Sequence, residues 1–417
     1  MLIEFSIENY LSFKELTTFS MLTAPSVKEF LEHTIPFNKK SFLKTSAIYG
    51  ANGSGKSNFI KAMKFMKDFV HSSSREGQVG DKINVERYRL STETDDKPCF
   101  FEIIFVHNNI RFRYGFTVDQ EQVYSEWLYQ TEKTKEAELF YRDENGIINI
   151  GSKFKDAEIL KNLVRKNALF LSVTAQFNLN TSISILEWFD KNFVVITTDM
   201  IGAKLTDILY DKFKNPQEER IINMMVNMAD LGINNILIEN NFTAEQIRQN
   251  SLIKDNMKIV TQHNKYDNNN NIISREIFDL EKHESDGTRK FLGLITFIID
   301  AATKGHVLIV DEIDSRLHPT LTRNLIALYN SLDSNTFKSQ LIFSTHDINL
   351  LSKDIFRRDQ IWFVEKDSYG ASTIYSLVEY KVRNDASFQK NYINGRYGAI
   401  PFLGDFNSVL QGSNESR

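Results

Sequence analysis

One short stretch, residues 50–57, constrains this 417-residue chain more than any other part of its sequence. It reads Gly-Ala-Asn-Gly-Ser-Gly-Lys-Ser and fits the phosphate-binding pattern G-x-x-x-x-G-K-[ST]. Residues 46–49 before it are short and apolar enough for a buried strand, and residues 58–66 after it have the apolar spacing of a helix. The sequence therefore predicts the strand, loop and helix that this motif requires, which disfavours a chance loop of Gly and Ser.

The residue types in this loop suit a nucleoside triphosphate. Glycines let the backbone curl so that several N–H groups point at phosphate oxygens, and the positive end of the following helix faces the same anion. We expect Lys56 to reach the β- and γ-phosphates and the Ser57 hydroxyl to bind Mg²⁺. The other predicted nucleotide-binding residues of the loop are Gly50, Asn52, Gly53, Ser54, Gly55 and Asn58.

Two further strand ends, far along the chain, carry candidate catalytic groups. Residues 306–310 are an apolar run that ends in Asp311 and Glu312, and a buried parallel strand delivers such carboxylates to its C-terminal edge. We expect Asp311 to hold Mg²⁺ and Glu312 to act as the general base on water. Residues 339–345 predict another buried strand, after which His346 can hydrogen-bond a γ-phosphate. A solvated acidic turn and a structural histidine are the simpler alternatives, and the phosphate-binding loop argues against both.

A Ser-x-Gly sequence precedes these strands. Ser285 can cap the N-terminal end of a helix expected over residues 291–299, and Gly287 permits close approach of another backbone. The pattern predicts a second helix N-terminus that can face an anion. Taken alone, ordinary helix capping explains it equally well.

Composition and charge bound the class of protein. The chain is 41% hydrophobic and 25% charged, which is typical of a soluble globular protein. No long uncharged apolar run and no signal peptide are present, so we expect a cytoplasmic location without membrane contact. A single cysteine, Cys99, excludes an internal disulfide and a multi-cysteine zinc site. The net charge of −4 makes no overall case for nucleic acid, although it is compatible with a local basic groove.

Antiparallel strands are predicted over much of the N-terminal part of the chain. Residues 2–7 and 100–150 have strand character, with hairpin turns at 108–109 and 145–146. Residues 24–44 look irregular.

The middle of the chain has a different pattern. Residues 168–173 predict a buried strand that ends near Gln176, and residues 181–250 are mostly helical in pattern. The polar stretch 264–271 predicts a loop between two strands, one ending near His263 and one over residues 274–280. The strongest helix covers residues 218–231, with Ile221, Ile222, Met225 and Met228 as its apolar face. The expected organisation is an N-terminal lobe (1–180), a mainly helical insertion (181–275), a C-terminal lobe (276–406) and a flexible polar tail (407–417).

The order of these motifs resembles the ABC-type ATPase superfamily. Residues 5–13, 285–288, 343–347 and 392–401 narrow the resemblance to the stand-alone OLD/SMC-like ABC ATPases, and among these to the RloA/AbiL-type ATPases of bacterial abortive-infection operons. The resemblance implies an α/β fold with an ABC-ATPase-like P-loop NTPase core. Such a core has a mixed, largely parallel sheet with helices, and an antiparallel β subdomain.

The same resemblance implies how the site works. It implies Mg²⁺-dependent ATP hydrolysis in a homodimer or higher oligomer, in which Ser285 and Gly287 of one copy cap the γ-phosphate held by the other. Asp314 resembles the D-loop aspartate, and Gln176 resembles a Q-loop glutamine that touches Mg²⁺. In this family the Ser-x-Gly sequence is the signature motif. Asp286 and Thr288 depart from the form that this motif has in transporters, which argues against a transporter subunit.

The resemblance also implies a role in anti-phage defence, with a separately encoded nuclease-like effector as partner. Two alternatives stay open. An SMC-like DNA-binding ATPase of DNA repair or maintenance is disfavoured because the sequence predicts no coiled-coil arm. A scaffold that is clamped by ATP without hydrolysing it is disfavoured because Glu312 is intact.

Overall fold

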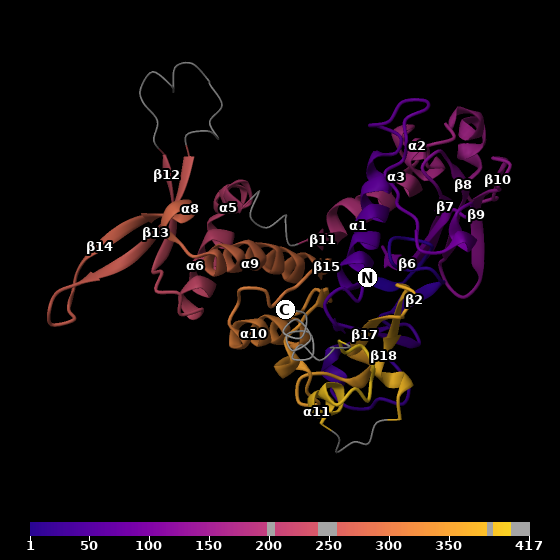
Figure 1. The fold of residues 1–417 in the computed structure, drawn as a ribbon. Coiled ribbons are helices and arrows are strands. Elements are labelled where there is room, and N and C mark those ends of the chain that lie inside the picture. The colour runs from indigo at the N-terminus through magenta and orange to yellow at the C-terminus, as the bar shows by residue number, and fades with distance from the viewer. Residues whose placement is uncertain (198–204, 241–256, 382–386, 402–417) are drawn as a thin grey trace, which may run out of the picture.

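The computed structural model describes residues 1–197, 205–240, 257–381 and 387–401 (Figure 1). The predicted polar tail, residues 407–417, lies outside this range. Helix α1 (Lys56–Ser72), which follows the phosphate-binding loop, packs between two large sheets. Its buried side chains, among them Phe59, Met63 and Met66, contact both sheets in one continuous core.

The first sheet is largely parallel and carries the predicted nucleotide motifs. Its strand order is β11 (Phe193–Ile196), β15 (Val307–Val310), β16 (Gln340–Ser344), β5 (Thr45–Tyr49), β17 (Ile361–Lys366) and β18 (Ser372–Ser376). All neighbours are parallel except β17 and β18. Helices α9 (Asp286–Lys304), α10 (Pro319–Asn330) and α11 (Phe388–Ile393) contribute to the core on the face away from α1. The predicted α/β P-loop NTPase fold is confirmed.

The second sheet is antiparallel and covers the other side of α1. Its order is β10 (Ile148–Ile150), β9 (Glu136–Arg142), β8 (Val123–Thr131), β7 (Ile110–Val118), β6 (Cys99–His107), β1 (Leu2–Glu8) and β2 (Thr17–Ser20). The predicted turn at Asn108 and Asn109 is confirmed, and both residues have positive φ, as asparagine tolerates. Phe5 of β1 meets Phe59 of α1 edge to face at 5.7 Å between ring centroids.

Within the described residues, the insertion contains the two expected strands and a third beside its helices, which corrects the prediction of a mainly helical insertion. It holds α5 (Leu205–Phe213) and α6 (Pro216–Met228), but also a three-stranded antiparallel sheet of β12 (Asn235–Asn240), β13 (Met257–Tyr266) and β14 (Ile272–Asp279), followed by α8 (Leu280–His283). Figure 1 shows the β13–β14 hairpin projecting from the body of the protein. The insertion also starts later than residue 181, since β11 pairs with β15 in the parallel sheet. On α6, Ile222 is buried as predicted, but Met228 is 78% exposed.

Three further segments differ from expectation or complete the fold. Residues 168–173 do not form a strand, because helix α2 (Phe170–Gln176) begins there and α3 (Asn180–Glu187) follows it. The segment predicted as irregular contains the hairpin of β3 (Thr34–Phe37) and β4 (Lys40–Leu43). Among the described helices, none is long and apolar enough to cross a membrane.

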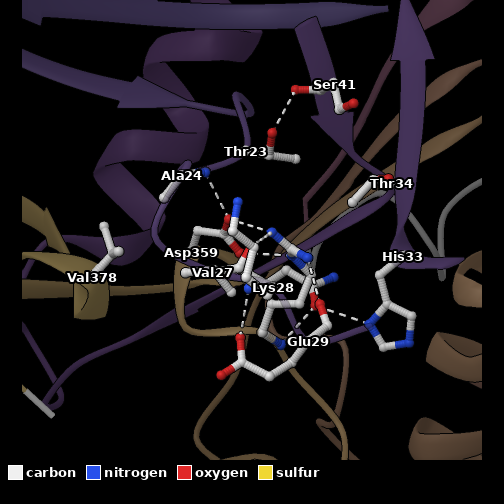
Figure 2. Close-up of polar contacts among 12 residues, drawn as sticks. Thr23, Ala24, Val27, Lys28, Glu29, His33, Thr34, Ser41, Asp359 and Val378 are labelled. Atoms are coloured by element: carbon white, nitrogen blue, oxygen red, sulfur yellow. Dashed lines mark hydrogen bonds and ion pairs between the residues drawn. The ribbon is translucent and has the colours of Figure 1, made fainter. Parts of the chain in front are cut away.

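A buried ion pair fixes the segment that leads into this hairpin (Figure 2). The Arg357 guanidinium donates to both carboxylate oxygens of Asp359, at 2.9 and 2.8 Å, and these side chains are only 1% and 3% exposed. Arg357 also donates to the carbonyls of Val27 and Glu29, and Asp359 accepts from the Ala24 amide at 2.8 Å. Two segments far apart in sequence are thereby held together.

Candidate nucleotide site

Three neighbouring strands of the parallel sheet bring the predicted motifs to one edge. Strand β16 lies between β5 and β15, and all three run in the same direction. Their C-terminal ends therefore lead side by side into the phosphate-binding loop after β5, His346 after β16, and Asp311 with Glu312 after β15. The carboxyl edge of a parallel sheet is where α/β proteins bind ligands.

The backbone of the phosphate-binding loop requires its glycines. Gly55 has φ of 116°, and a Cβ there would lie 2.4 Å from Ser372 Oγ. A Cβ at Gly50 would lie 2.3 Å from the Val364 carbonyl oxygen. Ser372 Oγ in turn donates to the Ser54 carbonyl at 2.6 Å, so strand β18 buttresses the loop.

Lys56, the first residue of α1, points back over the loop. Its Nζ donates to the carbonyls of Gly50 and Ala51 at 2.8 and 3.0 Å. Burial lowers the pKa of Lys56 to about 8, and the charges of Asp311, Glu312 and Asp314 oppose this shift. The structure thus brings the lysine of the first motif into the electrostatic field of the predicted catalytic carboxylates.

Ser344 joins the two carboxylate-bearing residues to the next strand. Its Oγ donates to Asp311 Oδ1 at 2.6 Å and accepts from the Glu312 amide at 2.7 Å. Asp311 is 4% exposed, and its amide donates to the Ile196 carbonyl of β11. The acidic pair is therefore held by hydrogen bonds from both neighbouring strands. Ser344 lies in the strand predicted over residues 339–345, and no local sequence pattern indicates these two hydrogen bonds.

Glu312 has an uncommon backbone conformation, with φ of 49°. Its carbonyl accepts a hydrogen bond from Lys290 Nζ at 2.7 Å. His346 lies on the neighbouring strand end, and its amide approaches the Asp314 carboxylate at 3.3 Å. Burial, followed by the charge of Lys56, lowers the pKa of His346, which favours the neutral imidazole at neutral pH.

The Ser-x-Gly sequence opens helix α9 as expected, although the helix begins earlier, at Asp286. Ser285 Oγ accepts from the Thr288 amide at 3.0 Å, and a Cβ on Gly287 would lie 2.6 Å from the Arg316 carbonyl oxygen. Asp286 forms ion pairs with Arg289 and Arg316. A cavity of about 860 Å³ lies here and is lined by Glu312, Lys290 and Arg316 among others. The helix start and the residues after β15 thus share one surface.

The structure does not support the predicted contact of Gln176 with Mg²⁺. Gln176 does not follow a strand but ends helix α2, where it is exposed. Ser172 of this helix donates to the Val70 carbonyl and hydrogen-bonds Ser73, at the end of α1 opposite to the phosphate-binding loop. Helix α1 is about 24 Å long at 1.5 Å per residue. We therefore assign Gln176 no part in the site.

The comparison with known families agrees with this geometry. A family model described as "AAA domain, putative AbiEii toxin, Type IV TA system" matches residues 46–352. The chain belongs to this AAA domain family. The match begins in β5, which leads into the phosphate-binding loop, and continues past His346, so it includes all three strand ends described above. No curated protein matches the chain.

Membership of the AAA domain family confirms the predicted P-loop ATPase class, and its description carries the expected association with abortive infection. The site also suits MgATP. The buried Ser54 Oγ in the phosphate-binding loop has no hydrogen-bond partner within the described residues. Ser57 and Asp311 offer a hydroxyl and a carboxylate oxygen, the kind of ligand that Mg²⁺ prefers. The remaining ligands of Mg²⁺ in such sites are usually substrate phosphates and waters.

Proposed function

We propose that this AAA domain protein hydrolyses ATP with Mg²⁺. The observation that carries the proposal is the meeting of Lys56, the Asp311–Glu312 pair and His346 at adjacent ends of three parallel strands. Lys56 Nζ gives up its hydrogen bonds to the Gly50 and Ala51 carbonyls and donates to oxygens of the β- and γ-phosphates instead. Ser57 and Asp311 hold Mg²⁺, which, when bound, neutralises charge on the phosphates and orients them.

Glu312 is the proposed general base. It orients a water in line with the γ-phosphate and takes up its proton. His346, held neutral by its surroundings, donates one N–H to a γ-phosphate oxygen. Since the Glu312 backbone is fixed by Ser344 and Lys290, its carboxylate starts from a restricted set of positions.

We further propose that ATP joins two copies of the chain. Ser285 and Gly287 lie at the start of a 19-residue helix, whose N-terminal dipole favours an anion. In the proposed dimer this helix start faces the γ-phosphate held by the other copy. Assembly and hydrolysis then switch a separately encoded effector, such as a nuclease, in a cytoplasmic anti-phage system of the abortive-infection type.

Phosphate release by the purified protein tests the hydrolysis, measured with and without duplex DNA. The wild type should turn over without DNA, and Glu312→Gln should bind ATP but release phosphate about 10²–10⁴-fold more slowly. Glu281→Gln is a matched control, because Glu281 lines the same cavity but accepts from Thr206 on the other side. Equal rates for wild type and Glu312→Gln would reject Glu312 as the base, and turnover only with DNA would favour a DNA-maintenance ATPase.

Sedimentation with ATP tests the dimer. Glu312→Gln, which should retain ATP, is expected to sediment as a dimer or larger assembly with MgATP, and Ser285→Arg in that background should stay monomeric. If Glu312→Gln sediments as a monomer both with and without MgATP, the composite site is rejected. The hydrolysis proposal is then still tested separately by phosphate release.

A further inference from the structure

A second cavity lies far from the nucleotide site, on the outer face of the antiparallel sheet. It measures about 610 Å³ and lies between the β3–β4 hairpin and the outer faces of β1, β6 and β7. Its apolar lining comes from Ile3, Leu22, Phe37, Phe42 and Ile104. On β1, Phe5 and Ile7 belong instead to the core around α1. The cavity therefore opens on the sheet face opposite to the phosphate-loop helix.

The rim of this cavity is positively charged. It includes Lys39, Lys40, Arg111 and Lys133. Within the described residues the three lysines form no ion pair. Arg111 is held by the sheet: its Nη2 donates to Thr131 Oγ1 at 3.1 Å and forms an ion pair with Glu136 at 3.5 Å.

The two carboxylates in the cavity lining form no ion pair with the three lysines. Glu132 accepts from Lys153 Nζ at 2.7 Å, which lies outside the lining, and this contact lowers the pKa of Glu132. Glu4 accepts from Ser20 Oγ at 3.3 Å. The cavity thus combines an apolar floor with three rim lysines that form no ion pair within the described chain.

The β3–β4 hairpin forms one wall of the cavity, and two sets of contacts hold it in place. Strands β3 and β4 pair over four residue pairs, and Thr23 donates to the Ser41 carbonyl through both its amide and its hydroxyl, each at 3.1 Å. The buried Arg357–Asp359 pair holds the preceding segment at Ala24, Val27 and Glu29 (Figure 2). The cavity is accordingly built into the fold, and its volume is in the range of small-molecule sites.

We propose that this cavity binds a small organic anion with an apolar body, such as a medium-chain carboxylate. The apolar part would cover the Leu22, Phe42 and Ile104 side chains, which gains hydrophobic free energy. The anionic group would lie among the three lysines, where it can accept charge-assisted hydrogen bonds. This site is separate from the nucleotide site and does not depend on the proposed ATPase mechanism.

Calorimetric titration with decanoate tests the proposal. Acetate serves as a probe of the carboxylate alone, and decan-1-ol as a probe of the apolar chain without the charge. Decanoate should bind with one-to-one stoichiometry, acetate should not bind, and decan-1-ol should bind at least tenfold more weakly. The triple variant Lys39→Ala/Lys40→Ala/Lys133→Ala should weaken decanoate binding at least tenfold. A matched triple variant of exposed lysines elsewhere, Lys155→Ala/Lys338→Ala/Lys353→Ala, should bind as the wild type does.

Three results would overturn this inference. They are no decanoate binding to the wild type, equal binding by the two triple variants, and decan-1-ol binding as tight as decanoate. Circular dichroism melting of both variants checks that each is folded. Since all the substituted lysines are exposed, we expect melting within a few degrees of the wild type.

Discussion

Lys290 Nζ donates a hydrogen bond to the backbone carbonyl of Glu312, 2.7 Å away, at a residue whose φ of 49° lies in the left-handed region. Such a conformation costs free energy for a residue with a Cβ and persists only where neighbours hold it. Lys290 is one turn into helix α9, four residues after Asp286. The contact therefore links helix α9, which begins at the Ser-x-Gly sequence, directly to the proposed general base.

Replacing Lys290 should slow hydrolysis more than it weakens ATP binding. Two side chains hydrogen-bond the Glu312 backbone, Lys290 at its carbonyl and Ser344 at its amide, and Lys290→Met removes the first of these bonds. We expect kcat to fall about tenfold with little change in KM. A hydrogen bond to a charged group contributes about 1.5–3 kcal/mol, and tenfold in rate corresponds to about 1.4 kcal/mol. Steady-state phosphate release over a range of ATP concentrations measures both parameters.

Two further variants make that result specific. Lys290→Arg keeps a charged donor and should recover part of kcat. Lys282→Met removes another lysine from the lining of the same cavity and should leave both parameters unchanged. If Lys282→Met slows hydrolysis as much as Lys290→Met, the effect reflects the charge of the cavity and not the contact with Glu312.

ATP binding should weaken above about pH 8. Burial lowers the pKa of Lys56 to about 8, so the ATP-free protein loses this charge as pH rises through that value. Phosphate binding favours charged lysine, and above pH 8 the protein must take up a proton when ATP binds. The dissociation constant should therefore rise by up to tenfold per pH unit between pH 8 and 9.5, measured with a fluorescent ATP analogue at constant ionic strength.

Lys56→Arg supplies the control for this pH dependence. Its guanidinium stays charged across the range, so its affinity, although weaker, should not vary with pH. A wild-type dissociation constant that is flat up to pH 9.5 would contradict the proposed titration of Lys56.

Ser344→Ala should lower both stability and activity. The substitution leaves the partly buried Glu312 amide without its acceptor and removes the donor to the buried Asp311 Oδ1. Leaving a buried donor unsatisfied costs about 1–3 kcal/mol, which urea unfolding can measure. Ser339→Ala is a matched control just before the same strand, where Ser339 Oγ donates to Asn335 at 2.7 Å. It should lose stability without loss of kcat, and equal activity losses would refute a specific role for Ser344.

Much of the nucleotide site could be predicted because its signals are local. The phosphate-binding loop, the strand ends at Asp311 and His346, and the cap at Ser285 each depend on residues close together in sequence. Their assembly then follows from parallel strand order. Ser344 and Lys290 could not be predicted in this way, since their partners lie on other elements of the fold.

The misread segment at residues 168–173 shows the same limit. A short apolar run does not by itself distinguish a buried strand from a buried helix. The structure favours a helix because Glu126 of β8 accepts hydrogen bonds from the amides of Phe170 and Leu171, at 2.6 and 3.0 Å, in the first turn of α2. That cap comes from a residue more than forty positions earlier in the chain, so no local pattern contains it. Because residues 170–176 form a helix, Gln176 does not follow a strand end, and the basis for the expected Mg²⁺ contact is removed.

The buried Arg357–Asp359 pair gives the last prediction. Asp359→Ala should destabilise the protein by about 3–5 kcal/mol, because it leaves a charged guanidinium buried without its carboxylate. The double variant Arg357→Met/Asp359→Leu removes both charges and should be less destabilised than the single variant. Urea unfolding measures each, and Lys191→Met, which breaks an exposed ion pair with Glu187, should cost less than about 1 kcal/mol. If the single and double variants are equally destabilised, lost packing rather than the unpaired charge dominates at this position.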